Sequence, residues 1–153
     1  MVYVCIDTNI YIKLLTDLVE EIDIYSKDGT KSTILEELNI LARNESIKLL
    51  VPEIVVLELK KANNRFEDDF SVNYNKLMES ISLVCDSLWS ETRDIKSKLL
   101  MLVEVEKEAK IKYWGEIYKY LEKMFDSEAV DKIYLTPEIL CQSQKRKSFD
   151  LCG

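Results

Sequence analysis

Two acidic residues stand where carboxylates could act together. Asp7 directly follows the apolar run Val2–Ile6, and Glu58 interrupts the apolar stretch Ile54–Leu59. If the strands preceding them are parallel neighbours, both carboxylates project into one crevice at the carboxyl edge of the sheet. Two carboxylates in one crevice repel each other unless a divalent cation lies between them, and hard oxygen ligands favour Mg²⁺ or Mn²⁺. Such ions can generate hydroxide and stabilise an in-line displacement at phosphorus.

Each acid also has a purely structural interpretation. Asp7 or Thr8 could simply cap the helix that follows. The helix face that carries Glu58 includes Ile54 and Ala62, so we expect it to be at least half buried, and a buried carboxylate seldom lacks a cation. The alternative for Glu58 is a salt bridge to one of three nearby cations: Lys60, Lys61 or Arg65.

The first part of the chain alternates strands and helices. The run Val2–Ile6 predicts a strand that is buried on both faces, with Cys5 as a buried thiol. Residues 10–18 predict a helix. Thr33 and Glu36 form a capping box that opens another helix. Residues 48–51 predict a second strand, and Pro52 begins a helix that we expect to end near Asn64. This order is typical of a parallel α/β sheet.

The second part is mostly helical. Apolar residues keep helical spacing from about Phe70 to Phe125, which predicts two or three long helices, arranged as an antiparallel hairpin on the sheet. Residues 133–135 predict a third strand, and Thr136 begins a helix that runs towards Lys147. The chain of 153 residues therefore predicts a single α/β domain.

Composition excludes several classes of chemistry. The chain has no histidine, so it cannot build a Ser-His-Asp triad or a histidine-ligated zinc site, and its three glycines form no phosphate-binding loop. Its four cysteines form no CxxC motif, and no apolar stretch is long enough to span a membrane. With no signal peptide, we expect a reducing, cytoplasmic protein.

A net charge of −7 disfavours non-specific binding to nucleic acid, but one basic run lies near the end of the chain. Lys145, Arg146 and Lys147 are either a solvated helix end or a phosphate contact. Four aromatic residues could stack on bases: Trp89, Trp114, Tyr118 and Tyr120. The helical spacing of Trp114 and Tyr118 favours a place in the core.

Two segments resemble the PIN-domain family. Residues 4–12, with Asp7-Thr8-Asn9 after an apolar strand, resemble its opening motif, and residues 51–60 resemble its second motif, with Glu58 as the glutamate. The resemblance implies a three-layer α/β fold with a helical insertion over 70–125. It also implies a Mg²⁺- or Mn²⁺-dependent endoribonuclease that acts on single-stranded RNA. Asp7 and Glu58 would be metal ligands and catalytic residues, supported by Thr8 and Asn9.

The chain departs from the family at its end. The family's third acid lies in a segment that should begin where this sequence stops, and Asp150 is the remaining candidate. Three interpretations follow: the chain is a piece of a longer protein, Asp150 is a substitute metal ligand, or the site is incomplete. In the last case the domain would be a binding module for an inhibitory or scaffolding protein. A structural α/β domain without a site is a further alternative.

Overall fold

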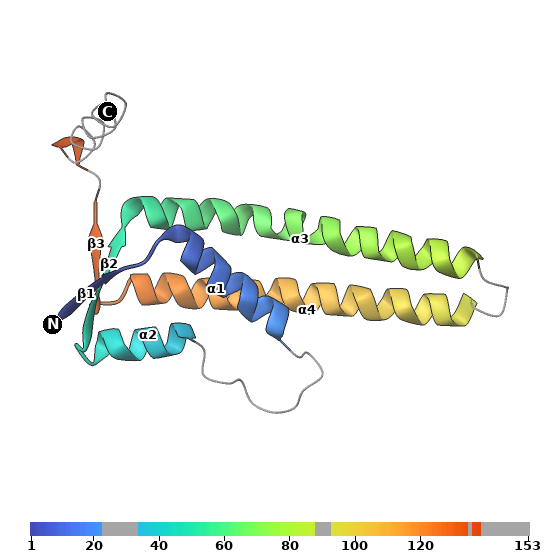
Figure 1. Cartoon of the computed structure of the whole chain (residues 1–153), viewed down its shortest axis with the longest axis horizontal. Helices are drawn as coiled ribbons and strands as arrows, with labels where there is room; N and C mark the ends of the chain where they lie inside the picture. Colours follow the sequence, from blue (N-terminus) through green and yellow to red (C-terminus); the bar gives the residue numbers. More distant parts are fainter. Residues whose placement is uncertain (23–33, 88–92, 135, 139–153) are drawn as a thin grey trace, which may run out of the picture.

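The computed structural model describes residues 1–22, 34–87, 93–134 and 136–138. Within them the chain folds into four helices and a three-stranded sheet (Figure 1). The elements, in chain order, are β1 (Val2–Cys5), α1 (Thr8–Glu21), α2 (Ile34–Arg43), β2 (Ile47–Pro52), α3 (Glu53–Ser87), α4 (Arg93–Phe125) and β3 (Val130–Ile133). The predicted α/β class is therefore confirmed. No described helix is both long enough and apolar enough to cross a lipid bilayer.

The strands are parallel and lie in the order β1-β2-β3. Cys5 pairs with Leu50, and Pro52 pairs with Ile133, so the carboxyl ends of all three strands meet at one edge of the sheet. The predicted parallel sheet is confirmed, and β1 and β2 are neighbours, which is the condition for placing Asp7 and Glu58 at one edge. The third strand begins three residues and ends two residues earlier than predicted, because the register with β2 ends at Ile133 and leaves Tyr134 beyond the last paired residue.

Burial alternates along the strands, which places the core on one face of the sheet. Leu49 and Val51 of β2 are fully buried, whereas Leu50 between them is not. In β1, Val4 packs against the core, but Tyr3 and Cys5 are exposed. The predictions of a doubly buried first strand and a buried Cys5 are therefore wrong. β1 is an edge strand of this sheet, and no described helix covers its second face. A third layer remains a prediction.

The helix that begins at Glu53 does not end near Asn64 but continues to Ser87, over 35 residues. Neither proline nor glycine occurs between Glu53 and Ser87, and Phe66 and Phe70 stack on each other one turn apart through the region where a break was expected. The ring of Phe66 also stacks on that of Trp114, with 3.8 Å between the ring centroids. These contacts keep the apolar stripe of the helix continuous.

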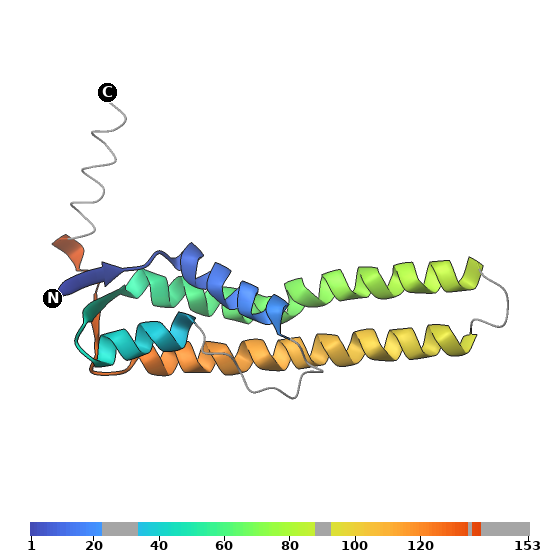
Figure 2. The same ribbon diagram turned by 60° about the horizontal axis from the view of Figure 1, so that its bottom comes forward.

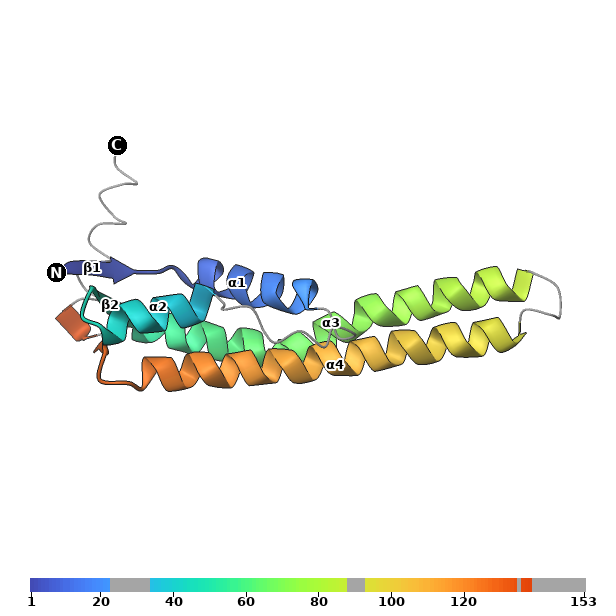
Figure 3. The same cartoon turned by 90° about the horizontal axis from the view of Figure 1, so that it is seen from below.

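α3 and α4 form an antiparallel hairpin, as predicted. Three contacts set its register: Trp114 Nε1 donates to Asn63 Oδ1 (2.9 Å), Tyr74 Oη to Glu106 Oε1 (3.2 Å), and Lys96 Nζ to Asp86 Oδ1 (2.7 Å). The half nearest the sheet packs against α1, but the other half extends well past α1 and α2 (Figures 2 and 3). The expectation that the hairpin lies on the sheet therefore holds for its proximal half alone.

The core joins α1 to both long helices. Tyr11, Leu15 and Val19 of α1 are almost fully buried. Across from them lie apolar residues of α3 and α4: Val55, Leu59, Trp114, Ile117, Tyr118 and Leu121. Trp114 and Tyr118 are thus core residues, as their spacing predicted, and so is Cys85 between the long helices, which is 9% exposed.

Candidate active site

The predicted site residues lie at the carboxyl edge of the sheet. Asp7 is the second residue after β1, and Glu58 lies on the second turn of α3, which begins directly after β2. β1 and β2 are hydrogen-bonded neighbours, so the starts of α1 and α3 lie beside each other. The fold therefore places both carboxylates at the edge that the sequence indicated.

A direct hydrogen bond ties these two helix starts together. The hydroxyl of Thr8 donates to Oε2 of Glu58 over 2.5 Å, across 50 residues of chain. Thr8 is the buried polar residue of the described core, with 5% of its surface exposed. The contact brings Glu58 next to the residue that follows Asp7, which spacing along the sequence could not establish.

Asp7 is the N-cap of α1, so the predicted capping role of this residue is confirmed. Its backbone is extended (φ −67°, ψ 148°), and Oδ1 accepts a hydrogen bond from the backbone N–H of Asn9 over 2.8 Å. Such a cap satisfies one of the free N–H groups at the first helical turn. Asn9 thus contributes its backbone N–H to the cap, and its side chain forms no hydrogen bond with a described residue. Among the described residues, Oδ2 of Asp7 accepts no hydrogen bond, so capping does not occupy the whole carboxylate.

Glu58 differs from expectation in its burial. It is exposed, and Ile54 on the same helix face is 43% exposed, because no described element covers this side of α3 beyond the α1 start. The predicted half-buried face is therefore wrong. The alternative of a salt bridge is not seen either, since none of the described lysines or arginines lies within ion-pairing distance of Glu58. Thr8 is its hydrogen-bonding partner.

A groove between α1 and α3 leads away from this edge. Its lining residues include Thr16 and Glu20 from α1 and Ala62, Arg65 and Asp69 from α3. Arg65 lies seven residues after Glu58 and so on nearly the same side of the helix, and it forms no ion pair with any described residue. From the sequence, Arg65 was expected only as a salt-bridge partner for Glu58, and its position in this groove was not predicted.

A third acidic residue follows β3, but it does not join the first two. The backbone N–H of Glu138 itself and the hydroxyl of Thr136 hydrogen-bond its carboxylate and lower its pKa, as at the start of a helix. The described part of the chain contains no group of three or more acidic or thiol side chains that could hold a metal ion. Asp150, Lys145, Arg146 and Lys147 lie outside the described residues, as does Trp89.

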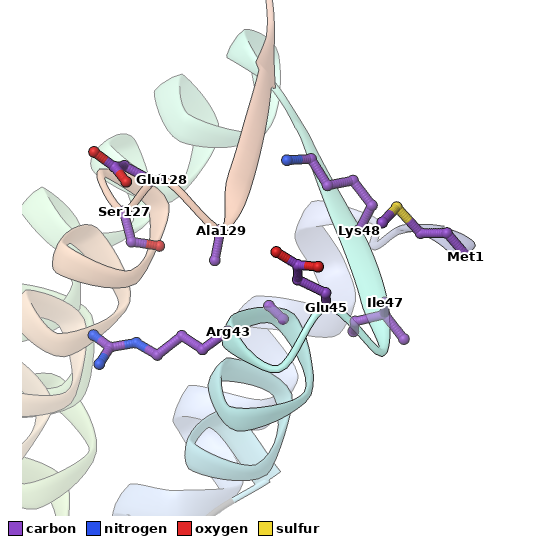
Figure 4. A pocket seen from close by; sticks show the side chains of 9 residues that line it. Met1, Arg43, Glu45, Ile47, Lys48, Ser127, Glu128 and Ala129 are labelled. Carbon is purple, nitrogen blue, oxygen red and sulfur yellow. The ribbon is translucent and has the colours of Figure 1, made fainter.

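A hollow at the opposite edge of the sheet is distinct from this site. It lies between the α2–β2 turn and the α4–β3 turn, and Glu45 points into it (Figure 4). Its charged lining residues have mixed signs: Arg43, Glu45, Lys48 and Glu128. Lys48 is already paired with Asp131 across β2 and β3 (3.0 Å). This edge therefore presents no concentration of carboxylates.

Comparison with known protein families, with curated proteins and with solved structures finds no significant match to this chain.

Proposed function

We propose that this protein is a metal-dependent endoribonuclease of the PIN-like type, which hydrolyses phosphodiester bonds of single-stranded RNA. The hydrogen bond between Thr8 and Glu58 is the observation that carries the proposal, because it joins the two motifs that resemble the family. Two acids at the ends of parallel neighbouring strands provide the hard oxygen ligands that Mg²⁺ or Mn²⁺ prefers.

The residues present fit a divalent cation in part. Asp7 keeps Oδ2, and Glu58 keeps Oε1, without a hydrogen bond among the described residues. Asp7 and Glu58 would hold the ion, which when bound lowers the pKa of a coordinated water and offsets charge on a phosphate. Thr8 fixes the orientation of the Glu58 carboxylate, and the Asn9 N–H fixes that of Asp7. Asp150 would complete the ligand set.

One cation in the groove between α1 and α3, Arg65, favours an RNA substrate, although Glu20 and Asp69 also line this groove. Arg65 places a guanidinium on the path that leaves the metal edge, where it can bind phosphate in a bidentate way. Lys145, Arg146 and Lys147 would add further phosphate contacts. The bound cation and these basic groups would offset the repulsion between RNA and a chain of net charge −7.

A second candidate function is a catalytically incomplete PIN-like module that binds a protein. One observation favours it: the described residues bring together two carboxylates and no third. Such a module would keep the fold and lack turnover, and its partner would be an inhibitory or scaffolding protein.

An RNA cleavage assay separates the two candidates. With the full-length protein and a labelled single-stranded RNA, we expect cleavage in Mn²⁺ or Mg²⁺ that excess chelator abolishes. Asp7→Asn and Glu58→Gln should each lower the rate by at least about 100-fold, because each removes a charged ligand. Glu79→Gln, on the exposed far half of α3, is the matched control and should cleave like the wild type.

Undiminished cleavage in excess chelator would contradict the metal mechanism. If the folded protein cleaves no RNA with either metal, the result would favour the binding module over the nuclease.

A further inference from the structure

The distal half of the α3–α4 hairpin carries an apolar seam that no described element covers. Its five residues, here called the distal seam, are Leu77, Val84, Ile95, Leu99 and Leu102. Their side chains are 39–60% exposed. Soluble proteins seldom leave a contiguous apolar surface of this kind uncovered unless it is an interface.

The distal seam continues the stripe that forms the core of the proximal half. On α3, Leu77 and Val84 follow Phe70 at intervals of seven residues, which keeps all three on one side of the helix. On α4, the steps from Ile95 to Leu99, Leu102 and then Tyr113 are four, three and eleven residues, which also keeps these side chains on one side of the helix. Phe70 and Tyr113 pack against the core that α1 helps to form, so the distal seam faces the same side as α1.

α1 is too short to cover this seam. Its 14 residues span about 21 Å, whereas the 35 residues of α3 span about 52 Å. Figures 1 and 3 show both long helices continuing past the end of α1. The proximal half thus has a helix packed on its two-helix layer, and the distal half lacks one among the described elements.

The charges of the distal hairpin suit a second copy of the same chain. Residues 71–112 contain seven basic and seven acidic side chains, so the excess negative charge of the protein lies elsewhere and does not oppose association here. On α4, residues 93–98 have three basic groups and one acidic group, whereas residues 104–108 have three acidic groups and one basic group. When two α4 helices pair antiparallel about Leu99 and Leu102, the positive segment of each lies opposite the negative segment of the other.

We propose that two chains associate through their distal seams and form an antiparallel four-helix bundle. The same surface contributes from both copies, as a two-fold symmetric interface requires. Each hairpin supplies one two-helix layer, and the apolar residues of both layers become the bundle core. This proposal does not depend on the proposed nuclease activity.

The first test measures the mass of the full chain in solution over a range of concentrations by analytical ultracentrifugation. We expect a dimer in the wild type. Leu99→Glu combined with Leu102→Glu should raise the dissociation constant by at least about 100-fold, because both residues would lie at the centre of the interface. The matched control is Met101→Glu, which alters helix propensity about as little as Leu→Glu does. Met101 is 62% exposed and lies on the other side of α4, so this variant should dimerise like the wild type.

A charge exchange tests the antiparallel arrangement. Arg93→Glu with Lys98→Glu makes residues 93–98 negative, and Glu104→Lys with Glu108→Lys makes residues 104–108 positive. Each double variant alone should dimerise more weakly than the wild type, and an equimolar mixture of the two should recover a heterodimer.

A wild type that stays monomeric at every concentration would overturn the proposal. So would a dimer that keeps its affinity in the Leu99 and Leu102 variant but loses it on Tyr3→Pro, since that result would place the contact at the edge strand β1. Circular dichroism of each variant checks that it is folded.

Discussion

At the scale of single residues, the site depends on one buried hydroxyl. Thr8 lies at the first turn of α1 and donates to Glu58, while Asp7 before it and Asn9 after it form the cap. A side chain that is 5% exposed and hydrogen-bonded to a carboxylate fixes the position of that carboxylate. Three consecutive residues therefore set the geometry of the proposed metal edge.

Tyr11, one turn further along α1, gives a prediction about stability. Its hydroxyl is buried and has no hydrogen-bonding partner among the residues that the structure describes, while its ring packs edge-on against Phe125. A buried polar group without a partner costs free energy, so Tyr11→Phe should raise the free energy of unfolding by about 1 kcal/mol at neutral pH. Urea unfolding measures the difference, with Tyr3→Phe, at a residue 65% exposed, as the control that should change little. A loss of stability in Tyr11→Phe would show that the hydroxyl makes a favourable contact.

The same pair of proteins should differ more at alkaline pH. Burial raises the pKa of Tyr11 well above its usual value of 10, so the unfolded chain loses this proton before the folded chain does. Ionisation of Tyr11 in the unfolded chain therefore leaves the free energy of unfolding unchanged below pH 10 and lowers it as pH rises further. Burial, reinforced by Glu122, also raises the pKa of Tyr118, to about 12. The wild type and Tyr11→Phe both contain Tyr118, so its contribution cancels in the comparison. Unfolding measured from pH 9 to 11 should show a shallower decline in Tyr11→Phe than in the wild type, and parallel curves would contradict this account.

At the scale of elements, the continuity of α3 is the least expected feature. Asn63, Asn64 and the acidic residues 67–69 weaken the helical signal, and the contact of Phe66 with Trp114, 48 residues away, is what sustains the helix. Such contacts come from the tertiary fold and have no local signature in the sequence.

A proline substitution tests this continuity. Asp68 is an exposed residue in the middle of α3, and Asp68→Pro would remove a backbone hydrogen bond and clash with the preceding turn. We expect a loss of about 3 kcal/mol in the free energy of unfolding, whereas the control Asp68→Ala should be neutral or slightly stabilising. A proline variant as stable as the wild type would indicate a loop at this position, as the sequence pattern suggested.

Periodicity and motifs were sufficient to predict most of the elements. The positions of β1, α1 and β2, the parallel arrangement of the strands and the helical hairpin follow from local patterns, whereas the full length of α3 does not. Burial could not be predicted in the same way. An apolar run such as Val2–Ile6 is typical of a central strand, yet β1 lies at the sheet edge, and the helix face of Glu58 is exposed. Which surfaces become covered depends on the arrangement of whole elements.

At the scale of the whole molecule, two regions have separate roles in our account. The α/β body holds the carboxylates of Asp7 and Glu58 at its carboxyl edge, and the distal half of the hairpin presents an apolar seam away from that edge (Figure 1). The two proposals can therefore fail independently. Variants at Leu99 and Leu102 should leave the binding of a cation by one chain unchanged, and variants at Asp7 should leave dimerisation unchanged.

A urea melt with and without Mn²⁺ tests directly whether Asp7 and Glu58 hold a divalent cation. At a hundred times the dissociation constant, Mn²⁺ should stabilise the wild type by about 2.7 kcal/mol. Asp7→Asn keeps the cap, because Asn caps a helix about as well as Asp, so in chelator it should be at least as stable as the wild type. Both Asp7→Asn and Glu58→Gln should lose most of the gain from Mn²⁺, while Glu79→Gln should retain it. If Mn²⁺ stabilises Asp7→Asn as much as the wild type, the paired-carboxylate site is wrong, and Asp7 is a helix cap alone.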